Sequence, residues 1–378
     1  VGEFAKLESR IDPSAEGIRA EGYRLQIDRR KILLTAIDSA GLFYGKQTLR
    51  QLATAQGIPC VEVLDNPRFA YRGMHLDVSR HFFPKEQIFK ILDEMAYYKL
   101  NKFHFHLCDN GGWRIQIDKY PLLTKLGSHR MEIEWLKWWD FGDKHYVPED
   151  TPGAYGGYYT KEDIRQIVSY AAGRHIDVIP EIEFPAHSDE VFVGYPEFCC
   201  TGRPYTTGEF CVGNPATLRF AEDVLTEIME LFPSKYIHIG GDEARKVAWK
   251  SCPKCQHLAR EVGGFEEVQC YMIEHLELFL AEHGRVMMGW DEILKNSLRS
   301  SSVPISYRGQ RGGIEGANRG LNVIMSPGER IYFDWYQANP HTQPRAMSGF
   351  SPIKKMYSFE PVPDTPERAA ANESLVKG

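Results

Sequence analysis

The sequence predicts an α/β protein built on a TIM-type (β/α)8 barrel. From Asn66 onward, short apolar runs alternate with amphipathic helical stretches, which is the pattern of a parallel sheet covered by helices. Polar or aromatic residues follow nearly every apolar run, as expected where the strand ends of a barrel form one rim. A doubly wound open sheet allows the same alternation but gathers its ligand groups at one switch point, so the barrel is favoured.

Seven barrel strands are expected from these runs, over residues 74–78, 102–107, 177–181, 236–239, 286–289, 304–307 and 322–325. Helices are expected over residues 85–99, 161–172, about 215–231 and about 265–282, because apolar residues recur there at helical spacing. The barrel domain is therefore assigned to residues 66–378.

Residues 1–65 are predicted to form a partial N-terminal α+β domain. Two strands, over 22–27 and 32–36, precede a helix over 41–53, which makes a β-β-α unit. Such a unit buries too little surface to be stable alone. We expect it to lean on the barrel or to belong to a larger domain that has been cut.

Charge and hydropathy exclude several classes of function. The 45 basic and 51 acidic residues give a net charge of −6, so no basic field favours nucleic acid, and a neutral substrate is expected. No window reaches the roughly 18 apolar residues of a membrane span, and residues 1–10 lack the layout of a signal peptide. We expect an exported protein, periplasmic or extracellular, whose signal has already been removed.

The eight cysteines predict neither a disulfide scaffold nor a metal site. Their spacing contains one short pair, Cys252-Pro-Lys-Cys255, and a structural zinc needs a second pair at similar spacing. Cys199, Cys200 and Cys211 do not supply a clean one. We therefore expect buried or loop thiols, with no metal and no cofactor.

A carboxylate pair follows one of the predicted strands, in Tyr236-Ile-His-Ile-Gly-Gly-Asp-Glu243. Glycines allow a sharp turn, and adjacent residues leaving a strand point in different directions, so Asp242 and Glu243 can address different atoms of one ligand. Two acids crowded in a partly dry pocket have pKa values that are pushed apart, which suits glycoside cleavage. Alone, the pair is better explained by a solvated acidic turn.

Further motifs accompany this pair. In chain order they are Arg72-Gly-Met-His-Leu-Asp-Val-Ser-Arg-His-Phe-Phe83, Phe105-His-Leu-Cys-Asp-Asn-Gly-Gly-Trp-Arg-Ile115, Glu181-Ile-Glu-Phe-Pro-Ala-His187, His238-Ile-Gly-Gly-Asp-Glu243, Met288-Gly-Trp-Asp-Glu292 and Tyr332-Phe-Asp-Trp335. These six blocks resemble those of the glycoside hydrolase family 20 β-N-acetylhexosaminidases, in the same order.

The resemblance implies an exo-acting retaining enzyme that removes terminal β-linked N-acetylglucosamine or N-acetylgalactosamine from glycans by substrate-assisted catalysis. In that scheme the substrate's 2-acetamido oxygen attacks the anomeric carbon, which differs from the usual two-carboxylate mechanism. By the match, Glu243 is the general acid and base, Asp242 steadies the acetamido group and the oxazolinium intermediate, and Tyr332 donates to the acetamido oxygen.

The same resemblance implies supporting roles. Arg72 matches the arginine that binds sugar hydroxyls O3 and O4, although a lone arginine is more often a surface charge. Asp109 and His187 match a buried relay that orients the acid–base glutamate, and a satisfied core histidine is the alternative. Asp334 matches a carboxylate that contacts O4 or O6, with an ordinary loop acid as the alternative.

Aromatic residues are expected around the acetamido group. Trp290 matches one wall of its pocket, against the alternative of a core tryptophan. A second family tryptophan falls at Tyr307, a departure that keeps the aromatic wall and adds a hydroxyl. The Trp138-Trp139 pair lies in a long loop and suits either an aglycone platform or loop packing.

The resemblance breaks at the C-terminal side. The family's eighth strand carries a tryptophan and a glutamate, and nothing after Tyr357 supplies them, since a short Pro-containing stretch and a polar helical tail to Gly378 follow. We therefore expect a truncated barrel. Two alternatives stay open: a glycan-binding barrel without turnover, and a conventional retaining glycosidase with an enzymic nucleophile.

Overall fold

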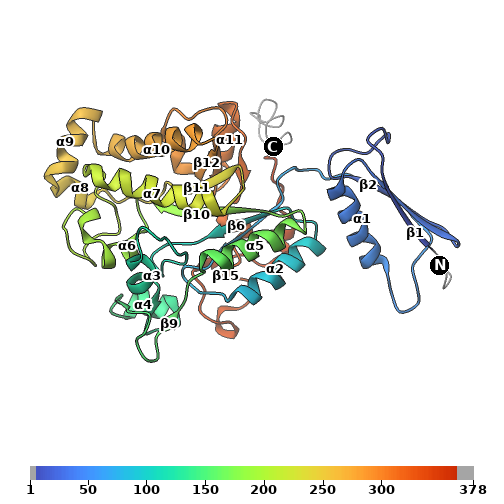
Figure 1. Cartoon of the computed structure of the whole chain (residues 1–378), viewed down its shortest axis with the longest axis horizontal. Coiled ribbons are helices and arrows are strands. Elements are labelled where there is room, and N and C mark those ends of the chain that lie inside the picture. Colours follow the sequence, from blue (N-terminus) through green and yellow to red (C-terminus); the bar gives the residue numbers. More distant parts are fainter. Residues whose placement is uncertain (1–5, 364–378) are drawn as a thin grey trace. The chain divides into compact units, whose positions relative to one another are not determined.

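The computed structural model describes residues 6–363. Its contacts divide the chain into two compact units, one of residues 1–74, 85–103 and 166–177 and the other of residues 75–84, 104–165 and 178–378. Figure 1 traces both in sequence colours. The expected N-terminal unit of two strands and a helix is present and larger than predicted, and the polar tail predicted up to Gly378 lies outside the described residues.

The N-terminal sheet has four strands in the order β1-β3-β2-β4. These strands and the helix beside them are β1 (Lys6–Ile11), β2 (Tyr23–Ile27), β3 (Lys31–Ala36), β4 (Glu62–Asp65) and α1 (Ser39–Leu52). Strand β2 pairs antiparallel with β3 and β4, whereas β1 pairs parallel with β3. All six residues of β1 are exposed, so no alternation of apolar and polar residues marked it as a strand.

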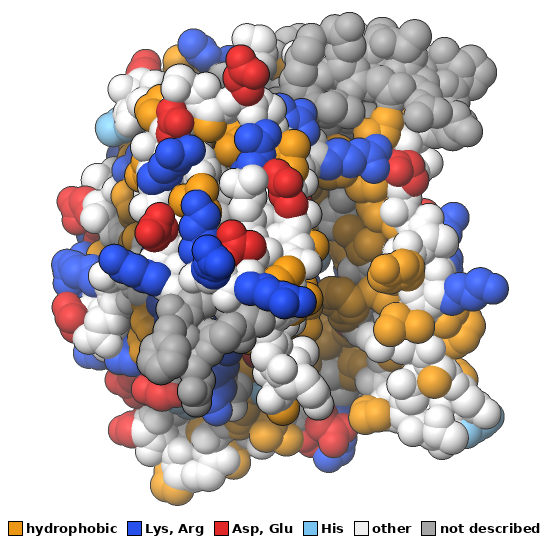
Figure 2. Space-filling model, turned by 90° about the vertical axis from the view of Figure 1, so that its right-hand side faces the viewer, with side chains coloured by type: hydrophobic (Ala, Val, Ile, Leu, Met, Phe, Trp, Pro, Cys, Tyr) orange, Lys and Arg blue, Asp and Glu red, His pale blue; other side chains and the backbone are white. Residues whose placement is uncertain are grey.

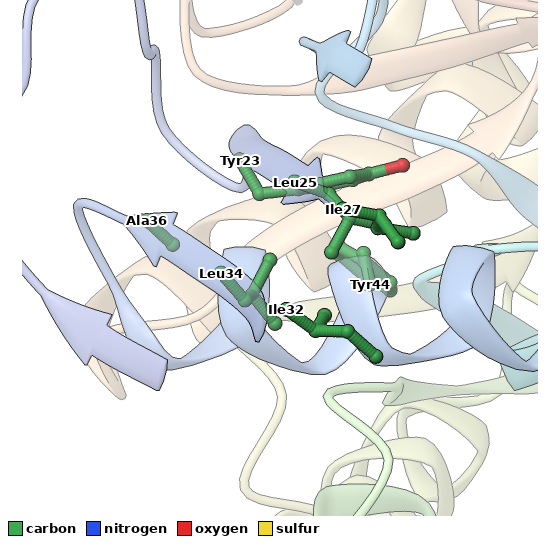
Figure 3. Packing of buried hydrophobic residues seen from close by; sticks show 7 residues of the cluster. All are labelled: Tyr23, Leu25, Ile27, Ile32, Leu34, Ala36 and Tyr44. Carbon is green, nitrogen blue, oxygen red and sulfur yellow. The ribbon is translucent and has the colours of Figure 1, made fainter. Parts of the chain in front are cut away.

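A small apolar core holds this unit together. Strands β2 and β3 turn alternate residues toward α1, where Leu25, Leu34 and Tyr44 are almost wholly buried (Figure 3). Helix α1 begins at an N-cap, because the Asp38 side chain accepts a hydrogen bond of 2.7 Å from the Gly41 N–H. The predicted helix of residues 41–53 therefore starts two residues earlier, at Ser39.

A seven-stranded sheet forms the barrel part, in the order β14-β13-β12-β11-β10-β6-β5. All seven predicted strands are present, and β10 to β14 pair in parallel in chain order. The strands are β5 (Gly73–Asp77), β6 (Lys102–His106), β10 (Asp177–Phe184), β11 (Tyr236–Gly240), β12 (Val286–Trp290), β13 (Val303–Ser306) and β14 (Ile324–Met325). Within the described residues no eighth strand joins this sheet, since β15 (Trp335–Tyr336) and β16 (Ser348–Phe350) pair with each other.

Helices form at all four predicted ranges, 85–99, 161–172, 215–231 and 265–282, and the further helices were not predicted. The helices of this part are α2 (Lys85–Tyr97), α3 (Leu122–Gly127), α4 (Trp135–Phe141), α5 (Lys161–Ala172), α6 (Asp189–Gly194), α7 (Pro215–Leu231), α8 (Val247–Ser251), α9 (Pro253–Val262), α10 (Phe265–Glu282), α11 (Arg311–Asn318), α12 (Gly328–Ile331) and α13 (Ile353–Tyr357), with short 3-10 turns at Pro196–Phe198, Asp291–Lys295 and Pro340–Thr342. Figure 1 shows α7 and α10 beside β10 to β12. Helix α7 starts where expected because Asn214 caps it and Pro215 occupies its first turn.

The long segment between β6 and α5 forms a small antiparallel sheet of its own, β8-β7-β9. Its strands are β7 (His129–Arg130), β8 (Tyr146–Val147) and β9 (Tyr155–Gly156), and α4 lies between the first two. Arg130 is wholly buried and donates to the backbone carbonyl groups of Gly111, Glu132 and Arg80. These bonds fix the segment in place.

None of the described helices is long and apolar enough to cross a membrane. On the face shown in Figure 2, basic and acidic side chains are intermixed with apolar ones.

Candidate active site

The carboxylate pair leaves strand β11 through a glycine turn. Gly240 and Gly241 have φ angles of +69° and +93°, which side chains rarely adopt. A Cβ atom on Gly240 would also overlap the carboxylate of Glu183, which packs against the turn. Glu243 has a φ of +50°, a costly value for a residue with a side chain. The turn sets the direction of both carboxylates.

The two carboxyl groups have unlike environments. Asp242 is buried, and burial, with the nearby Glu181 and Glu243 carboxylates, raises its pKa to about 7 despite the opposing effect of His187. Glu243 is exposed, and a hydrogen bond from His187 lowers its pKa. Of the two carboxyl groups, that of Asp242 therefore holds a proton more readily in the free chain, although the resemblance implies that Glu243 is the acid.

His187 links Glu243 to Asp109. Its Nδ1 lies 3.2 Å from Asp109 Oδ1, and its Nε2 lies 3.4 Å from Glu243 Oε2 and 3.7 Å from Asp242 Oδ2. Burial disfavours a charged imidazole, but the Asp109 and Glu243 carboxylates outweigh it and raise the pKa of His187 well above 6.5. The protonated imidazole can therefore donate a proton to Glu243.

Arg80 anchors the far end of this chain of groups. Its guanidinium lies 2.6 Å from Asp109 Oδ2 and 2.7 Å from Asp77 Oδ2. Burial would raise the pKa of Asp109, but Arg80 outweighs it and keeps that pKa well below its usual range. Asp109 is thus a permanent anion that holds the proton on His187.

A layer of histidines lies around one buried carboxylate, that of Glu181. Burial lowers the pKa of His104 to about 3, so this imidazole is neutral. In contrast, the pKa of His106 is raised, because Glu181, Asp77 and Asp109 outweigh its burial. The four imidazoles nearest to Glu181 are those of His75 at 3.2 Å, His104 at 2.8 Å, His238 at 2.8 Å and His106 at 3.7 Å.

Two groups in this layer are spaced closely enough to hold a cation: His75, His104 and Glu181 form one, and His106, Asp109 and Glu183 form the other. Each is also a set of imidazole–carboxylate pairs, which explains the arrangement without a metal.

Sequence reasoning missed Arg80, Glu183 and these histidines as site residues, although all lie within the quoted motifs or the predicted strands. The signal was available in Lys102-Phe-His-Phe-His106, where the histidines alternate with apolar residues and so share one face of the strand.

An aromatic wall stands next to the carboxylates. The buried ring of Trp290 lies 5.4 Å from that of Tyr307 and 5.0 Å from that of His238. Burial, together with Glu181, Asp334 and Asp242, raises the pKa of Tyr332, so its hydroxyl stays a donor at neutral pH. Asp334 is exposed, and its backbone carbonyl accepts the Met347 N–H at 2.9 Å.

The hydrogen bonds of the Arg72 guanidinium do not connect it to the carboxylates of the site. The guanidinium donates to the Glu21 carboxylate at 2.7 Å and to the carbonyl oxygens of Phe69 and Lys99 at 2.8 and 2.9 Å. Its predicted role in binding hydroxyls gains no support from these contacts.

A cleft of about 800 Å³ opens beside Glu243 and His187. Trp138 and Trp139 line it, and the Trp139 ring stacks on that of Trp135, with centroids 5.5 Å apart. Trp138 is buried and donates to the His145 carbonyl at 3.3 Å, so it also packs the loop. The cleft therefore adjoins the carboxylate of Glu243.

Comparison with known proteins agrees with this geometry. Residues 69–378 match the model of "Glycosyl hydrolase family 20, catalytic domain", and residues 5–66 match "Glycosyl hydrolase family 20, domain 2". A beta-hexosaminidase of Porphyromonas gingivalis is 40% identical over 368 residues, covering 92% of this chain and 45% of that protein. One from Vibrio furnissii is 35% identical over 364 residues, covering 91% of this chain and 58% of the relative.

Solved structures give the same result. The exo beta-N-acetylglucosaminidase of Vibrio harveyi, in complex with N-acetylglucosamine, superposes with a TM-score of 0.82 at 30% identity, covering 97% of this chain and 59% of the other. The chain spans about half the length of the two curated relatives. The family model alone matches well over half of the chain. The chain belongs to glycosyl hydrolase family 20.

Proposed function

We propose that the chain is the catalytic part of a retaining β-N-acetylhexosaminidase, which removes terminal β-linked N-acetylhexosamine from glycans by substrate-assisted catalysis. The observation that carries this proposal is the Asp109–His187–Glu243 chain beside the buried carboxyl group of Asp242. This arrangement places a protonated imidazole, that of His187, next to Glu243 and adds a second acid, Asp242, in a different environment. The mechanism requires both.

In the first step the acetamido oxygen of the substrate forms a bond to the anomeric carbon while the bond to the leaving oxygen breaks. Glu243 gives its proton to that oxygen. In the free chain this proton resides on His187, 3.4 Å away. A docked glycan that expels water from around Glu243 disfavours the charged carboxylate, so the proton passes to it from His187.

Asp242 acts on the other end of the substrate's amide. The acetamido N–H is a donor to the Asp242 carboxylate, and the ring that forms carries positive charge. Both favour the ionised form of an acid whose pKa is about 7 in the free chain, and a proton that Asp242 holds before binding is released to solvent. In the second step water attacks the anomeric carbon, gives a proton to Glu243 and releases the amide oxygen.

The aromatic residues and one arginine complete the proposed site. Tyr332 donates to the acetamido oxygen, and Trp290 with Tyr307 packs the methyl group. We assign the sugar hydroxyls to Arg80 rather than to Arg72. Arg80 lies on the relay, and its buried Nε has no hydrogen-bond partner among the described residues, whereas Arg72 donates to three groups.

Hydrolysis of 4-nitrophenyl N-acetyl-β-glucosaminide tests the proposal. We expect turnover by the unaltered chain and a loss of about 10²–10⁴-fold in Glu243→Gln, the usual contribution of general acid catalysis. Glu261→Gln is the matched control, because Glu261 is an exposed helical residue paired with His257 at 3.3 Å. Equal rates in the unaltered chain and Glu243→Gln would favour a glycan-binding barrel without turnover.

A thiazoline mimic of the cyclised intermediate distinguishes substrate assistance from the remaining alternative, a conventional enzymic nucleophile. Assistance by the acetamido group predicts that the mimic binds much more tightly than N-acetylglucosamine, because it resembles the transition state. A conventional enzymic nucleophile predicts no such gain, so similar affinities for the two compounds would overturn the substrate-assisted mechanism.

A further inference from the structure

Four of the eight cysteines meet at one point of the fold. The sulfur atoms of Cys200, Cys211, Cys252 and Cys255 all lie within 4.8 Å of one another. Three of the separations, Cys200–Cys255, Cys211–Cys252 and Cys211–Cys255, are 3.7 Å each. Three of these residues are buried and Cys200 is half-buried.

These separations fit a metal ion better than they fit disulfides. A disulfide holds its sulfurs about 2.05 Å apart. Four thiolates placed tetrahedrally about 2.3 Å from a zinc ion have edges of about 3.8 Å. The 3.7 Å separations lie close to that edge. We propose that Cys200, Cys211, Cys252 and Cys255 bind one structural zinc ion in a closed four-thiolate site.

The local backbone is built for this convergence. Cys252 precedes α9 and Cys255 lies in its first turn, the two-residue spacing that zinc sites use. A Cβ atom on Gly213 would overlap the backbone of Lys254 and Cys255, so glycine is needed for the segment after Cys211 to come this close.

The proposed zinc joins two loops that follow neighbouring barrel strands. Cys200 and Cys211 come from the loop after β10, and Cys252 and Cys255 from the segment after β11. The same two segments are tied by the Arg245 N–H, which donates to Glu209 at 2.8 Å, and by Trp249 Nε1, which donates to the Phe210 carbonyl at 2.8 Å.

This position suggests what the ion does. Cys200 and Cys252 line the cleft that Glu243 and His187 also line, so the four-cysteine site forms part of the cleft wall next to the carboxylates. With four protein thiolates the ion has no open position for water or substrate. Its role is therefore structural, and it fixes the wall without taking part in the reaction.

The expectation of no metal came from sequence spacing. Cys252 and Cys255 form a recognisable pair, but Cys211 lies 41 positions before Cys252, and Cys200 and Cys211 are not a short pair with each other. Two loops that meet only in the fold supply the second half of the site, so local spacing could not reveal it.

The experiment measures metal in tag-free protein after dialysis against metal-free buffer. We expect one zinc per chain by elemental mass spectrometry, and a denatured, unreduced chain mass with all eight thiols intact. Cys255→Ser should lose the zinc. Cys199→Ser is the matched control: Cys199 is adjacent to Cys200, but its sulfur contacts Thr201 and the Arg203 carbonyl instead, so this variant should retain the zinc.

Three results would overturn the proposal: substoichiometric zinc, iron in its place, or a chain mass lowered by two hydrogens for each disulfide. If Cys255→Ser does not fold, X-ray absorption at the zinc edge of the unaltered protein decides the matter. Four sulfur neighbours at about 2.3 Å support the site, and nitrogen or oxygen neighbours contradict it.

Discussion

Asp109→Asn separates the charge of the proposed proton relay from its shape. The Asp109 carboxylate lies 3.2 Å from His187 Nδ1 and 2.6 Å from Arg80, and its side chain is almost wholly buried. Asparagine keeps the size of the side chain and removes its charge. The substitution therefore takes away the anion that outweighs the burial of His187 and keeps its imidazole protonated.

The size of the effect follows from the distance. Unit charges 3.2 Å apart interact by about 1.3 kcal/mol in water and about 5 kcal/mol at an effective dielectric constant of 20. At about 1.4 kcal/mol per unit, this range corresponds to roughly one to four pKa units. Neighbouring opposite charges commonly shift a pKa by about 1–3 units, so we expect the pKa of His187 to fall by that amount.

The assay is the pH dependence of kcat/KM for the nitrophenyl substrate, which reports groups of the free protein. The active form holds one proton on the His187–Glu243 pair, and raising the pH removes it. Lowering the pKa of His187 therefore moves the alkaline limb to lower pH, by about 1–3 units.

Asp77→Asn is the matched control. Asp77 shares the Arg80 partner, at 2.7 Å, while the ion-pair partners of His187 are Asp109, Asp242 and Glu243. Each substitution takes one partner from Arg80, so a stability loss of up to about 3 kcal/mol is expected in both. The relay assignment is wrong if Asp109→Asn leaves the alkaline limb in place, or if Asp77→Asn moves it equally.

Three further predictions concern the turn, the N-terminal core and the buried acid. Gly240→Ala should lower the free energy of unfolding by about 3 kcal/mol in urea, because it combines a left-handed φ with overlap of Glu183, and an unchanged midpoint would contradict this. Leu34→Ala should cost about 2–5 kcal/mol in the same assay, since Leu34 is fully buried, whereas Leu7→Ala on exposed β1 should cost under about 0.5 kcal/mol. Affinity for N-acetylglucosamine, whose acetamido N–H needs an ionised acceptor, should fall as the pH drops below about 7, the pKa of Asp242, and Asp242→Asn should remove this dependence in a titration series.

Local patterns predicted the elements that local physics decides. Helix α7 was expected over residues 215–231 and occupies Pro215–Leu231, because a capping asparagine, a first-turn proline and an apolar stripe all agree. Strand β1 was not expected, because all of its residues are exposed and its pairing with β3 depends on a partner more than twenty positions later. Hydrophobic periodicity reflects the burial of one face of a strand, and no residue of β1 is buried.

The candidate site shows the same limit. Asp242 and Glu243 were visible as a pair because they are adjacent in sequence, and Asp109 and His187 only through the family resemblance. The ion pair between Arg80 and Asp109 joins motifs almost thirty positions apart, and no local rule distinguishes Arg80 from Arg72 eight positions earlier. The contacts in the fold made that distinction.

The protonation state of the free site follows from where its charges are buried. Asp242 lies in the dry interior beside the ionised Glu181, whereas Glu243 is exposed and receives a hydrogen bond from His187. An acid that stays ionised in water and gains a proton only when substrate dries its surroundings does not need a raised pKa of its own. The buried Asp109 instead holds the proton one hydrogen bond away, on His187. In the proposed mechanism, substrate binding expels water and so moves this proton from His187 to Glu243.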